Sequence, residues 1–266
     1  MSTYIEPRQD DPRSIDELVN AALSECDEDI AWDAVVALHR RGSAEVLQRA
    51  RELCRSPCPQ ERELGANVLS QLGVPNRTFP LECSELLGEM LHREQSARVL
   101  SAVLIATSWH DVLNVVEQAV KFANHPEVDV RHAVVMALTG HNEDLAIQTL
   151  IRLTEDSDNH VRDWATFAIG TQSALDIPAI RCALAARLDD PDECTRGEAL
   201  VGLARRSDQR VVPALKKELA LDCVGYLPVE AAELIRSPEL QHLLIKLRNG
   251  CDASSELLER AITACS

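Results

Sequence analysis

Aromatic residues are scarce in this chain, which has three Trp, three Phe and two Tyr among its 266 residues. The hydrophobic content of 45% is carried mainly by Ala, Leu and Val. Small and aliphatic side chains favour closely packed helices, whereas sheets are enriched in aromatic and β-branched residues. The chain has enough hydrophobic residues for a continuous core, so we expect an ordered, all-α protein.

Positive charge is also in short supply. The sequence has 27 Lys and Arg against 43 Asp and Glu, a formal net charge of −16. Phosphate backbones and anionic lipid surfaces attract cationic proteins, so we expect neither nucleic acid nor a membrane as partner.

No apolar run approaches the roughly 20 residues that span a bilayer, and residues 1–13 lack the apolar stretch of a secretory signal. We therefore expect a cytoplasmic protein in which the nine dispersed cysteines are free thiols that fill small spaces in the core.

Motifs of known catalytic and cofactor sites are missing from the sequence. There is no Gly-x-Ser-x-Gly, no Gly-x-Gly-x-x-Gly and no phosphate-binding loop. Cys54 and Cys58 have no second Cys or His pair nearby to complete a zinc site. Two Glu-x-x-His segments, at Glu89 and Glu239, have the spacing of di-iron proteins but lie too far apart to share one metal. We predict no catalytic residue, no metal and no cofactor.

The sequence does contain an internal repeat. Its clearest copies are centred on Arg131, Arg162 and Arg196. In each copy a small or branched apolar residue follows the Arg by three positions, Ala or Gly by six, and Leu or Ile by seven. Weaker copies start at Ala31, Arg62, Arg98 and Pro228, and successive copies begin 31 to 36 residues apart. A period of this size is typical of stacked helix pairs.

Each repeat is predicted to hold two helices. The repeated positions fall on one face of a first helix, and a short break then leads to a second segment with helical hydrophobic periodicity. We expect these second helices at residues 43–53, 81–91, 110–122, 143–154, 177–188, 209–219 and 239–247.

A capping helix precedes the repeats. Ser14 and Glu17 form a capping box, which predicts a helix over Ile15–Ser24 that covers the apolar end of the stack. The expected organisation is a polar tail at 1–13 and one domain at 14–266, with the capping helix in 14–25.

The repeats resemble a known family. An acidic turn at Asp158, the pair Val161-Arg162 and a closing Leu-Asp-Asp-Pro that ends at Pro191 are similar to bacterial HEAT repeats of the phycobilisome-lyase-like type. The resemblance is clearest over 127–221 and weaker over 27–124. It implies a right-handed α-solenoid of about seven helix pairs, whose second helices line a concave, protein-binding face. It does not imply bilin chemistry, because one fold can carry many functions.

Arginine recurs near the start of the first helices, close to acidic turn residues such as Asp129, Asp158 and Asp192. Residues that repeat with the period of a solenoid usually serve the interfaces between neighbouring repeats. We therefore predict a structural ladder of Asp–Arg contacts, and not a phosphate-binding site. The ladder residues are Arg62, Arg98, Arg131, Arg162 and Arg196.

The exposed side of the second helices is the predicted protein-binding surface, and it changes from acidic to basic along the chain. The alternative interpretation is that this charged surface only keeps the protein soluble. The candidate binding residues are Glu85, Glu89, Asp111, Asn114, Gln118, Glu143, Gln148, Arg152 and Arg181.

The residues and the family resemblance together leave three possible functions. The leading hypothesis is a bacterial scaffold or adaptor, not an enzyme, that binds a partner protein along the concave face. The second is an immunity or inhibitor protein for a basic toxin or enzyme, motivated by the net charge of −16 and the acidic stretch 6–33. The third is a bilin lyase-like enzyme, which rests only on the family resemblance.

Overall fold

The computed structural model describes residues 11–250 and 256–266, which form sixteen α-helices, three short 3-10 or π segments and no strand. The predicted all-α, HEAT-type fold is confirmed. Contacts between residues divide the chain into two compact units, Met1–Ala137 and Leu138–Ser266, and each is described by itself. The right-handed twist, the count of about seven pairs and the single domain at 14–266 stay predictions. Of the predicted tail, residues 1–10 lie outside the described residues.

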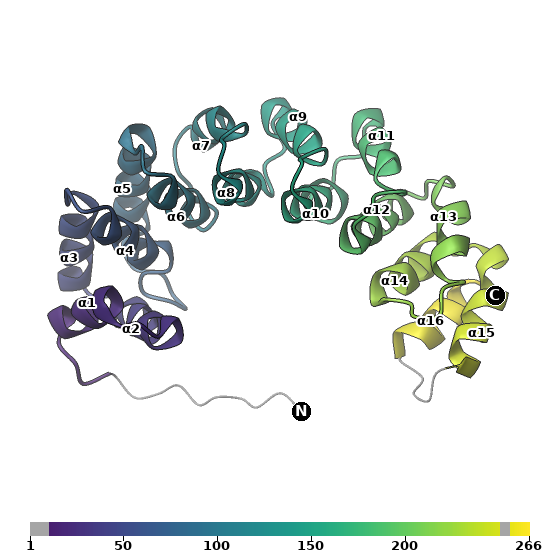
Figure 1. Cartoon of the computed structure of the whole chain (residues 1–266), viewed down its shortest axis with the longest axis horizontal. Coiled ribbons are helices and arrows are strands. Elements are labelled where there is room, and N and C mark those ends of the chain that lie inside the picture. Colours follow the sequence, from purple (N-terminus) through teal and green to yellow (C-terminus); the bar gives the residue numbers. More distant parts are fainter. Residues whose placement is uncertain (1–10, 251–255) are drawn as a thin grey trace. The chain divides into compact units, whose positions relative to one another are not determined.

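Unit 1 contains eight α-helices and one 3-10 turn; the last of these helices ends one residue beyond the unit (Figure 1). They are α1 (Ile15–Ser24), α2 (Glu28–Arg41), α3 (Ala44–Cys54), α4 (Pro59–Ser70), α5 (Pro80–Arg93), α6 (Ala97–Thr107), α7 (Val115–Ala119), η1 (Val120–Phe122) and α8 (Val128–Leu138).

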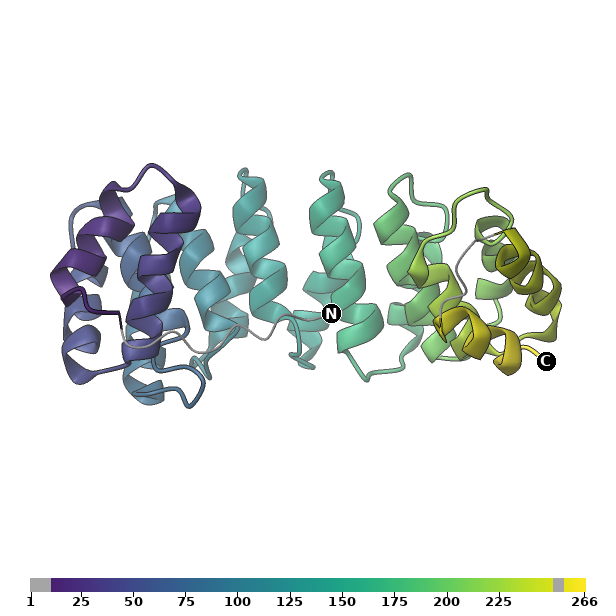
Figure 2. The ribbon, with the colours of Figure 1, turned by 90° about the horizontal axis from the view of Figure 1, so that it is seen from below.

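Unit 2 contains the remaining helices, which stack side by side in the same manner (Figure 2). They are α9 (Asp144–Leu153), α10 (Asn159–Phe167), the π segment η2 (Ala168–Gln172), α11 (Pro178–Ala186), α12 (Glu193–Arg205), α13 (Val211–Glu218), α14 (Tyr226–Ile235), η3 (Pro238–Leu240), α15 (Gln241–Gly250) and α16 (Glu256–Ala264).

Helix starts follow local capping signals in the sequence. The Ser14 hydroxyl accepts a hydrogen bond from the Glu17 amide and the Glu17 carboxylate accepts one from the Ser14 amide, so α1 has the predicted capping box and the predicted bounds. Asp27, Asp158 and Asp192 cap α2, α10 and α12 by accepting backbone N–H groups. Such caps satisfy amides that have no partner within the helix.

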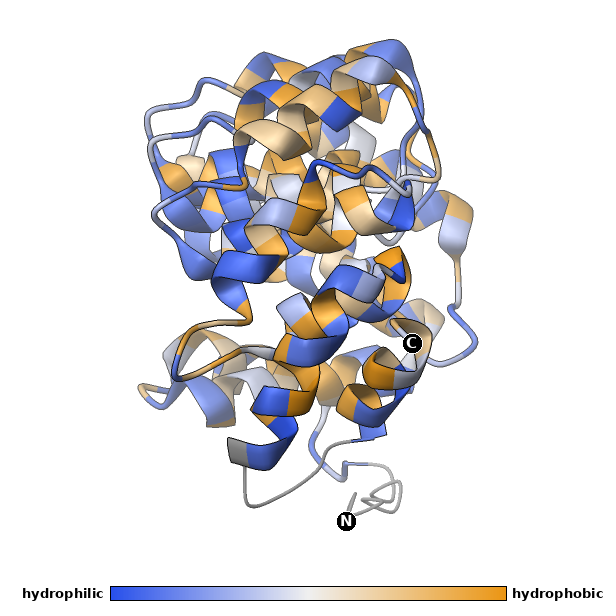
Figure 3. Cartoon of the chain, turned by 90° about the vertical axis from the view of Figure 1, so that its right-hand side faces the viewer, coloured by the Kyte–Doolittle hydropathy of each residue, from blue (hydrophilic) through white to orange (hydrophobic). Residues whose placement is uncertain are grey.

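The helices of each unit form two layers. In unit 2, α9, α11 and α13 make one layer and α10, α12, α14 and α16 the other; the same alternation runs through α1 to α8 in unit 1 (Figure 1). Hydrophobic residues lie between the layers and hydrophilic residues mark the turns and outer surfaces (Figure 3). The fully buried side chains are mostly aliphatic, as in Leu38, Leu104 and Ile169.

Even-numbered helices, which carry the Arg-containing repeat copies, approach one another much more closely than odd-numbered helices do. A Cβ added at Gly202 in α12 would lie only 2.8 Å from the Cα of Gly170 in η2, the segment that follows α10. Since one layer is packed more tightly than the other, each unit bends toward its even-numbered helices. The expectation that the second, odd-numbered helices line the inner face is therefore wrong, because small residues allow the first helices to come together.

The predicted helix at 110–122 is much shorter than expected. Regular α-helix begins only at Val115, because the backbone at Asn114 turns through the left-handed region with φ of 56°. His110 is held outside the helix, where its Nε2 donates to the carbonyl oxygens of Leu69 and Ser70 at 2.9 and 3.1 Å. Val112 is buried and anchors the loop. Tertiary contacts thus replace the first turn of this predicted helix.

Cysteines in the described residues form no disulfide. Cys54, Cys83 and Cys265 are buried and fill the core, as predicted for small apolar side chains. Burial raises the pKa of Cys54 to about 12, so this thiol stays protonated. Others, such as Cys182 and Cys194, are exposed, which the expectation of core positions did not anticipate.

Candidate functional site

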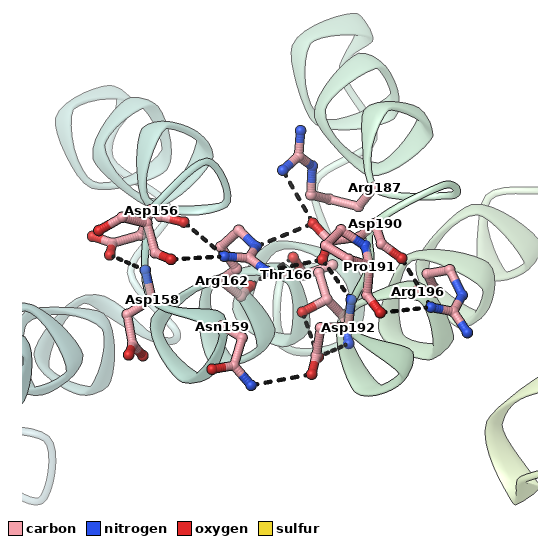
Figure 4. Close-up of polar contacts among 12 residues, drawn as sticks. Asp156, Asp158, Asn159, Arg162, Thr166, Arg187, Asp190, Pro191, Asp192 and Arg196 are labelled. Atoms are coloured by element: carbon pink, nitrogen blue, oxygen red, sulfur yellow. Dashed lines mark hydrogen bonds and ion pairs between the residues drawn. The ribbon is translucent and has the colours of Figure 1, made fainter.

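The arginine ladder is clearest between α10 and α12 (Figure 4). Arg162 donates through Nε and Nη2 to the two carboxylate oxygens of Asp190, at 3.1 and 3.0 Å, and through Nη1 to the backbone carbonyls of Asp156 and Ser157. Only 2% of the Asp190 side chain is exposed. One arginine thus links the loop before α10 to the loop before α12.

Two further arginines make equivalent contacts. Arg62 pairs with Glu94 at 2.7 Å and Arg196 pairs with Glu218 at 2.8 Å, and both also donate to carbonyls of the preceding turn. Burial opposes ionisation of Glu94, but hydrogen bonds from Arg62 and from backbone amides outweigh it and lower the pKa of this carboxyl. These arginines contact neighbouring repeats, but their acidic partners are glutamates and not the turn aspartates that the sequence suggested.

The remaining two arginines differ from each other. Arg131 is the fourth helical residue of α8 and donates to the carbonyls of His125 and Pro126, in the same way as the other ladder residues. Arg98 is only the second residue of α6, is 71% exposed and pairs with Glu63 of α4. Arg98 is therefore outside the ladder's register, which corrects the prediction for this residue.

The turn aspartates do not serve as the ladder's acidic partners. Asp158 accepts the backbone N–H groups of His160 and Val161, and Asp192 accepts the N–H and hydroxyl of Thr195. Asp129 is exposed. The partner of Arg162 lies two residues before the next N-cap, because a cap oxygen is already occupied by the helix amides.

In unit 1 the predicted binding residues lie on or beside odd-numbered helices. Glu85 and Glu89 are exposed on α5, and Glu89 is 3.7 Å from Arg55. Asp111 and Asn114 are exposed in the loop before α7, and Gln118 is half-buried within α7. These side chains belong to the outer layer of the unit.

In unit 2 the predicted binding residues are also on odd-numbered helices. Glu143 directly precedes α9 and lies 3.5 Å from His141, while Gln148 and Arg152 are exposed further along α9. Arg181 of α11 pairs with Asp176 at 2.6 Å and Asp208 at 3.2 Å, so its guanidinium already has a structural role. The nine predicted residues are thus split between the two units, and their function as a binding site stays a prediction.

A hollow of about 610 Å³ lies on the even-numbered helices of unit 1. Residues from α2, α4, α6 and the start of α8 line it, so it crosses the inner layer of that unit. Its floor contains small and apolar side chains, and its charged lining residues are Glu28, Glu63, Arg98, Glu127 and Asp129. We call this hollow the α2–α8 groove.

Sequence reasoning missed the α2–α8 groove because it assigned the inner face to the wrong layer. The groove residues nevertheless recur with the repeat. In α4 the groove residues Glu63 and Asn67 are the fifth and ninth helical positions, and in α6 the same positions are Ser101 and Ile105. Equivalent positions of two Arg-containing helices, all of them half-buried, thus line the groove.

Unit 2 carries a group of carboxyls on its even-numbered helices. Burial, followed by the negative charge of Asp163, raises the pKa of Glu198 in α12 to about 7. Burial also raises the pKa of Asp163 in α10, whose Oδ1 is buried without a hydrogen-bond partner in the described residues. Thr171 donates to Glu198 at 3.4 Å. At neutral pH this face holds a carboxyl that is only partly ionised.

No cluster of three or more His, Cys, Asp or Glu side chains with metal-binding geometry occurs in residues 11–250 and 256–266. Over the same ranges, every helix is too short or too polar to cross a bilayer.

The chain is similar to known helical repeat proteins, although no protein-family model matches it. It is 30% identical over 201 residues to protein YibA of Escherichia coli (strain K12), a match that covers 73% of this chain and 71% of YibA. The X-ray structure of the Escherichia coli YibA protein superposes with a TM-score of 0.77 at 27% identity, over 95% of this chain and 92% of that one. Importin beta is similar in fold alone, with a TM-score of 0.58 at 15% identity, over 94% of this chain and 42% of importin beta.

The alternating helix layers and the arginine ladder define the class, an all-α protein of stacked HEAT-type repeats. Within that class, the chain belongs to the same family as YibA.

Proposed function

We propose that this protein is a scaffold that binds a partner protein along the exposed side of its even-numbered helices. The observation that carries the proposal is the α2–α8 groove, to which four helices of unit 1 contribute side chains. Stacked repeats expose one long surface of this kind, and a partner can contact several helices at once. The binding face therefore differs from the one that the sequence suggested.

Binding, and not catalysis, is the activity that the groove chemistry supports. Ser101 is the only Ser, Thr or Cys among the groove residues, and its hydroxyl donates to the backbone carbonyl of Asp129 at 3.2 Å. A catalytic serine needs a base within hydrogen-bonding distance, and Ser101 is engaged elsewhere. We accordingly propose that the protein is not an enzyme, and that it acts in the cytoplasm, where its thiols would stay reduced.

A second candidate is an immunity or inhibitor protein for a basic toxin or enzyme. The excess of carboxylates in the groove favours it, together with the net charge of −16. The bilin lyase-like enzyme stays a prediction, and absorption spectra recorded with a bilin and a carrier protein test it.

Two matched sets of substitutions test the scaffold proposal. The first places Arg on the even-numbered helices, and the second places the same number of Arg residues on the odd-numbered helices at exposed or half-buried positions. The first set is Asn67→Arg, Ser101→Arg and Cys194→Arg, and the second is Gln48→Arg, Gln118→Arg and Gln148→Arg.

Proteins that co-purify with the unaltered chain are identified by mass spectrometry, and each is then purified and titrated against both variants. We expect the first variant to lose at least about tenfold in affinity for a specific partner, because three large side chains block the contact face. The second variant should bind as the parent does. Equal affinity of all three proteins for every partner would contradict the proposal.

A further inference from the structure

We infer that the α2–α8 groove holds a segment of the partner protein that contains Lys or Arg residues. This inference rests on the proposed scaffold function and specifies the chemistry of the partner. Its basis is the combination of an apolar floor with carboxylates that have no cation of their own.

Charge in the groove is strongly unbalanced. Among the described residues that line it there are four carboxylates, from Glu28, Glu63, Glu127 and Asp129, and one cation, Arg98. Arg98 pairs with Glu63, which is 19% exposed. In the described part of the chain, the other three carboxylates form no ion pair. Three carboxylates without an ion pair therefore line one hollow, and a cation that enters it would interact favourably with them.

The positions of these acids in their helices need a separate explanation. Glu28 and Asp129 are in the first turns of α2 and α8, and Glu127 directly precedes α8. Acids at such positions are common because they interact favourably with the helix dipole, by about 0.3–1 kcal/mol each. That effect accounts for each acid singly. It does not account for their convergence on one hollow, which the packing of α2, α4, α6 and α8 produces.

The floor of the groove matches the stem of a basic side chain. Ala97, Ala102 and Ile105 contribute apolar atoms, and the two alanines leave room above the helix. Lys and Arg lay their methylene groups along apolar surfaces and keep the charged end in water or on a carboxylate. An anionic or purely apolar segment would leave the carboxylates of the groove without a partner.

Direct binding of a peptide tests the inference. The probe is a fluorescein-labelled peptide of alternating Lys and Ala, and its control has Glu in place of Lys. Fluorescence anisotropy should report binding of the Lys peptide only, weakening strongly as NaCl is raised to about 0.3 M. Absence of binding by the Lys peptide, or equal binding of the Glu peptide, would overturn the inference.

Two triple variants with the same net charge distinguish the effect of the groove carboxylates on peptide binding from the effect of the protein's overall charge. The groove variant is Glu28→Gln, Glu127→Gln and Asp129→Asn, and the control variant, on exposed residues of unit 1 outside the groove, is Glu85→Gln, Asp111→Asn and Glu117→Gln. The groove variant should lose about tenfold in affinity or more, and the control about twofold or less. Equal losses would mean that the peptide follows only the net charge, which would overturn the inference.

A third variant tests the shape of the groove. Ser101→Trp fills the hollow without changing its charge, and we expect it to weaken binding of the Lys peptide as much as the groove variant does. Circular dichroism melts confirm that each variant is folded. Unchanged binding by a folded Ser101→Trp protein would overturn the inference.

The outcomes also separate this inference from the scaffold proposal. If partner proteins are lost from the Arg variant of the even-numbered helices but bind the groove triple variant normally, the scaffold function stands and the basic segment is wrong. Sedimentation velocity tests the remaining possibility, that a second copy of this chain occupies the groove. A dimer in the parent that becomes a monomer in the groove variant would assign the groove to a second copy of this chain and overturn the inference.

Discussion

Asp190 is a buried carboxylate that joins three helices of unit 2. It follows α11, precedes α12, and accepts hydrogen bonds from Arg162 of α10, from Arg187 at 3.3 Å and from the Asp192 amide at 3.0 Å. Both charges of the Arg162–Asp190 pair are largely removed from water, with side-chain exposures of 11% and 2%. Removal of one partner would leave a buried charge without compensation.

We therefore expect Asp190→Ala to destabilise the protein by about 3–5 kcal/mol, since Arg162 would lose its partner inside the protein. Urea unfolding followed by circular dichroism measures the effect. The matched control is Lys217→Ala, because the Lys217–Asp189 pair is 74% and 83% exposed. Surface pairs of this kind contribute roughly 0–1 kcal/mol. A similar cost for both variants would contradict a structural ladder.

Glu198 is a carboxyl whose environment disfavours ionisation. Burial is the largest cause of its pKa of about 7, and the charges of Asp163 and Glu230 add to it. The hydrogen bond from Thr171 and the charge of Arg205 act in the opposite direction. The folded state thus binds a proton at Glu198 more tightly than the unfolded chain, in which the pKa is near its ordinary value of 4.5.

This difference predicts a pH dependence with a definite sign. The contribution of Glu198 to stability is fully present below about pH 4.5 and is lost as the pH rises through about 7. Glu198→Gln should therefore stabilise the protein at pH 8 by about 1–2 kcal/mol, given about 1.4 kcal/mol per pKa unit and partial access of solvent. Near pH 4.5 the parent and variant should have similar thermal midpoints. A variant that is less stable than the parent at pH 8 would show that Glu198 is held as a carboxylate.

At the scale of elements, glycine sets how closely the even-numbered helices pack. Gly170 and Gly202 face each other where η2 meets α12, and an added Cβ at Gly202 would also lie 2.9 Å from Leu184 Cδ1. We expect Gly202→Ala to lower stability by about 1–3 kcal/mol, because two backbones would have to separate.

Gly88 in α5 provides the matched control for this substitution. A Cβ there would meet only Val112 at an ordinary 3.5 Å. Gly88→Ala should stabilise the protein by about 0.5–1 kcal/mol, since alanine is the better residue within a helix. Thermal unfolding of both variants checks the pair, and destabilisation of equal size at both positions would contradict the role of close helix contact.

A side chain at the end of the neighbouring helix donates hydrogen bonds to the backbone carbonyls of the π segment η2 and of the loop after it. Arg206, which directly follows α12, donates to the carbonyl oxygens of Ile169, Gly170, Ser173 and Leu175 at 2.7 to 3.2 Å. Carbonyls at the end of a helix otherwise lack donors. Burial lowers the pKa of Arg206, and the backbone carbonyls are the groups that hold its guanidinium in place.

Element positions explain why the repeat pattern misplaced one arginine. Arg62, Arg131, Arg162 and Arg196 are the fourth residues of their helices, whereas Arg98 is the second residue of α6. The repeat pattern aligned Arg98 with the other four arginines because small and apolar residues follow it at nearly the same offsets. The position of the N-cap, Ser96, decides the difference, and a shift of two residues turns a side chain to another face of the helix.

For the whole molecule, the net charge of −16 comes from acidic residues along the entire sequence. Four of these acidic residues line the hollow in unit 1. The acidic stretch at 6–33 contributes Glu28, which lines the groove from α2. The other charged groove residues come from α4, α6 and the start of α8, far along the sequence. A general preference for a basic partner could be inferred from composition, whereas the site that would bind it could not.

The sequence by itself determined the helical class, the repeat, the capping box at Ser14 and the structural use of four arginines. These features depend on local periodicity and on hydrogen bonds between near neighbours, which the order of residues specifies directly. Tertiary structure alone decided which helix layer lies on the inner side of each unit, because that depends on how closely helices such as α10 and α12 can approach. It also ended the predicted helix at 110–122 early, since His110 binds carbonyls at the end of α4 instead of continuing a helix.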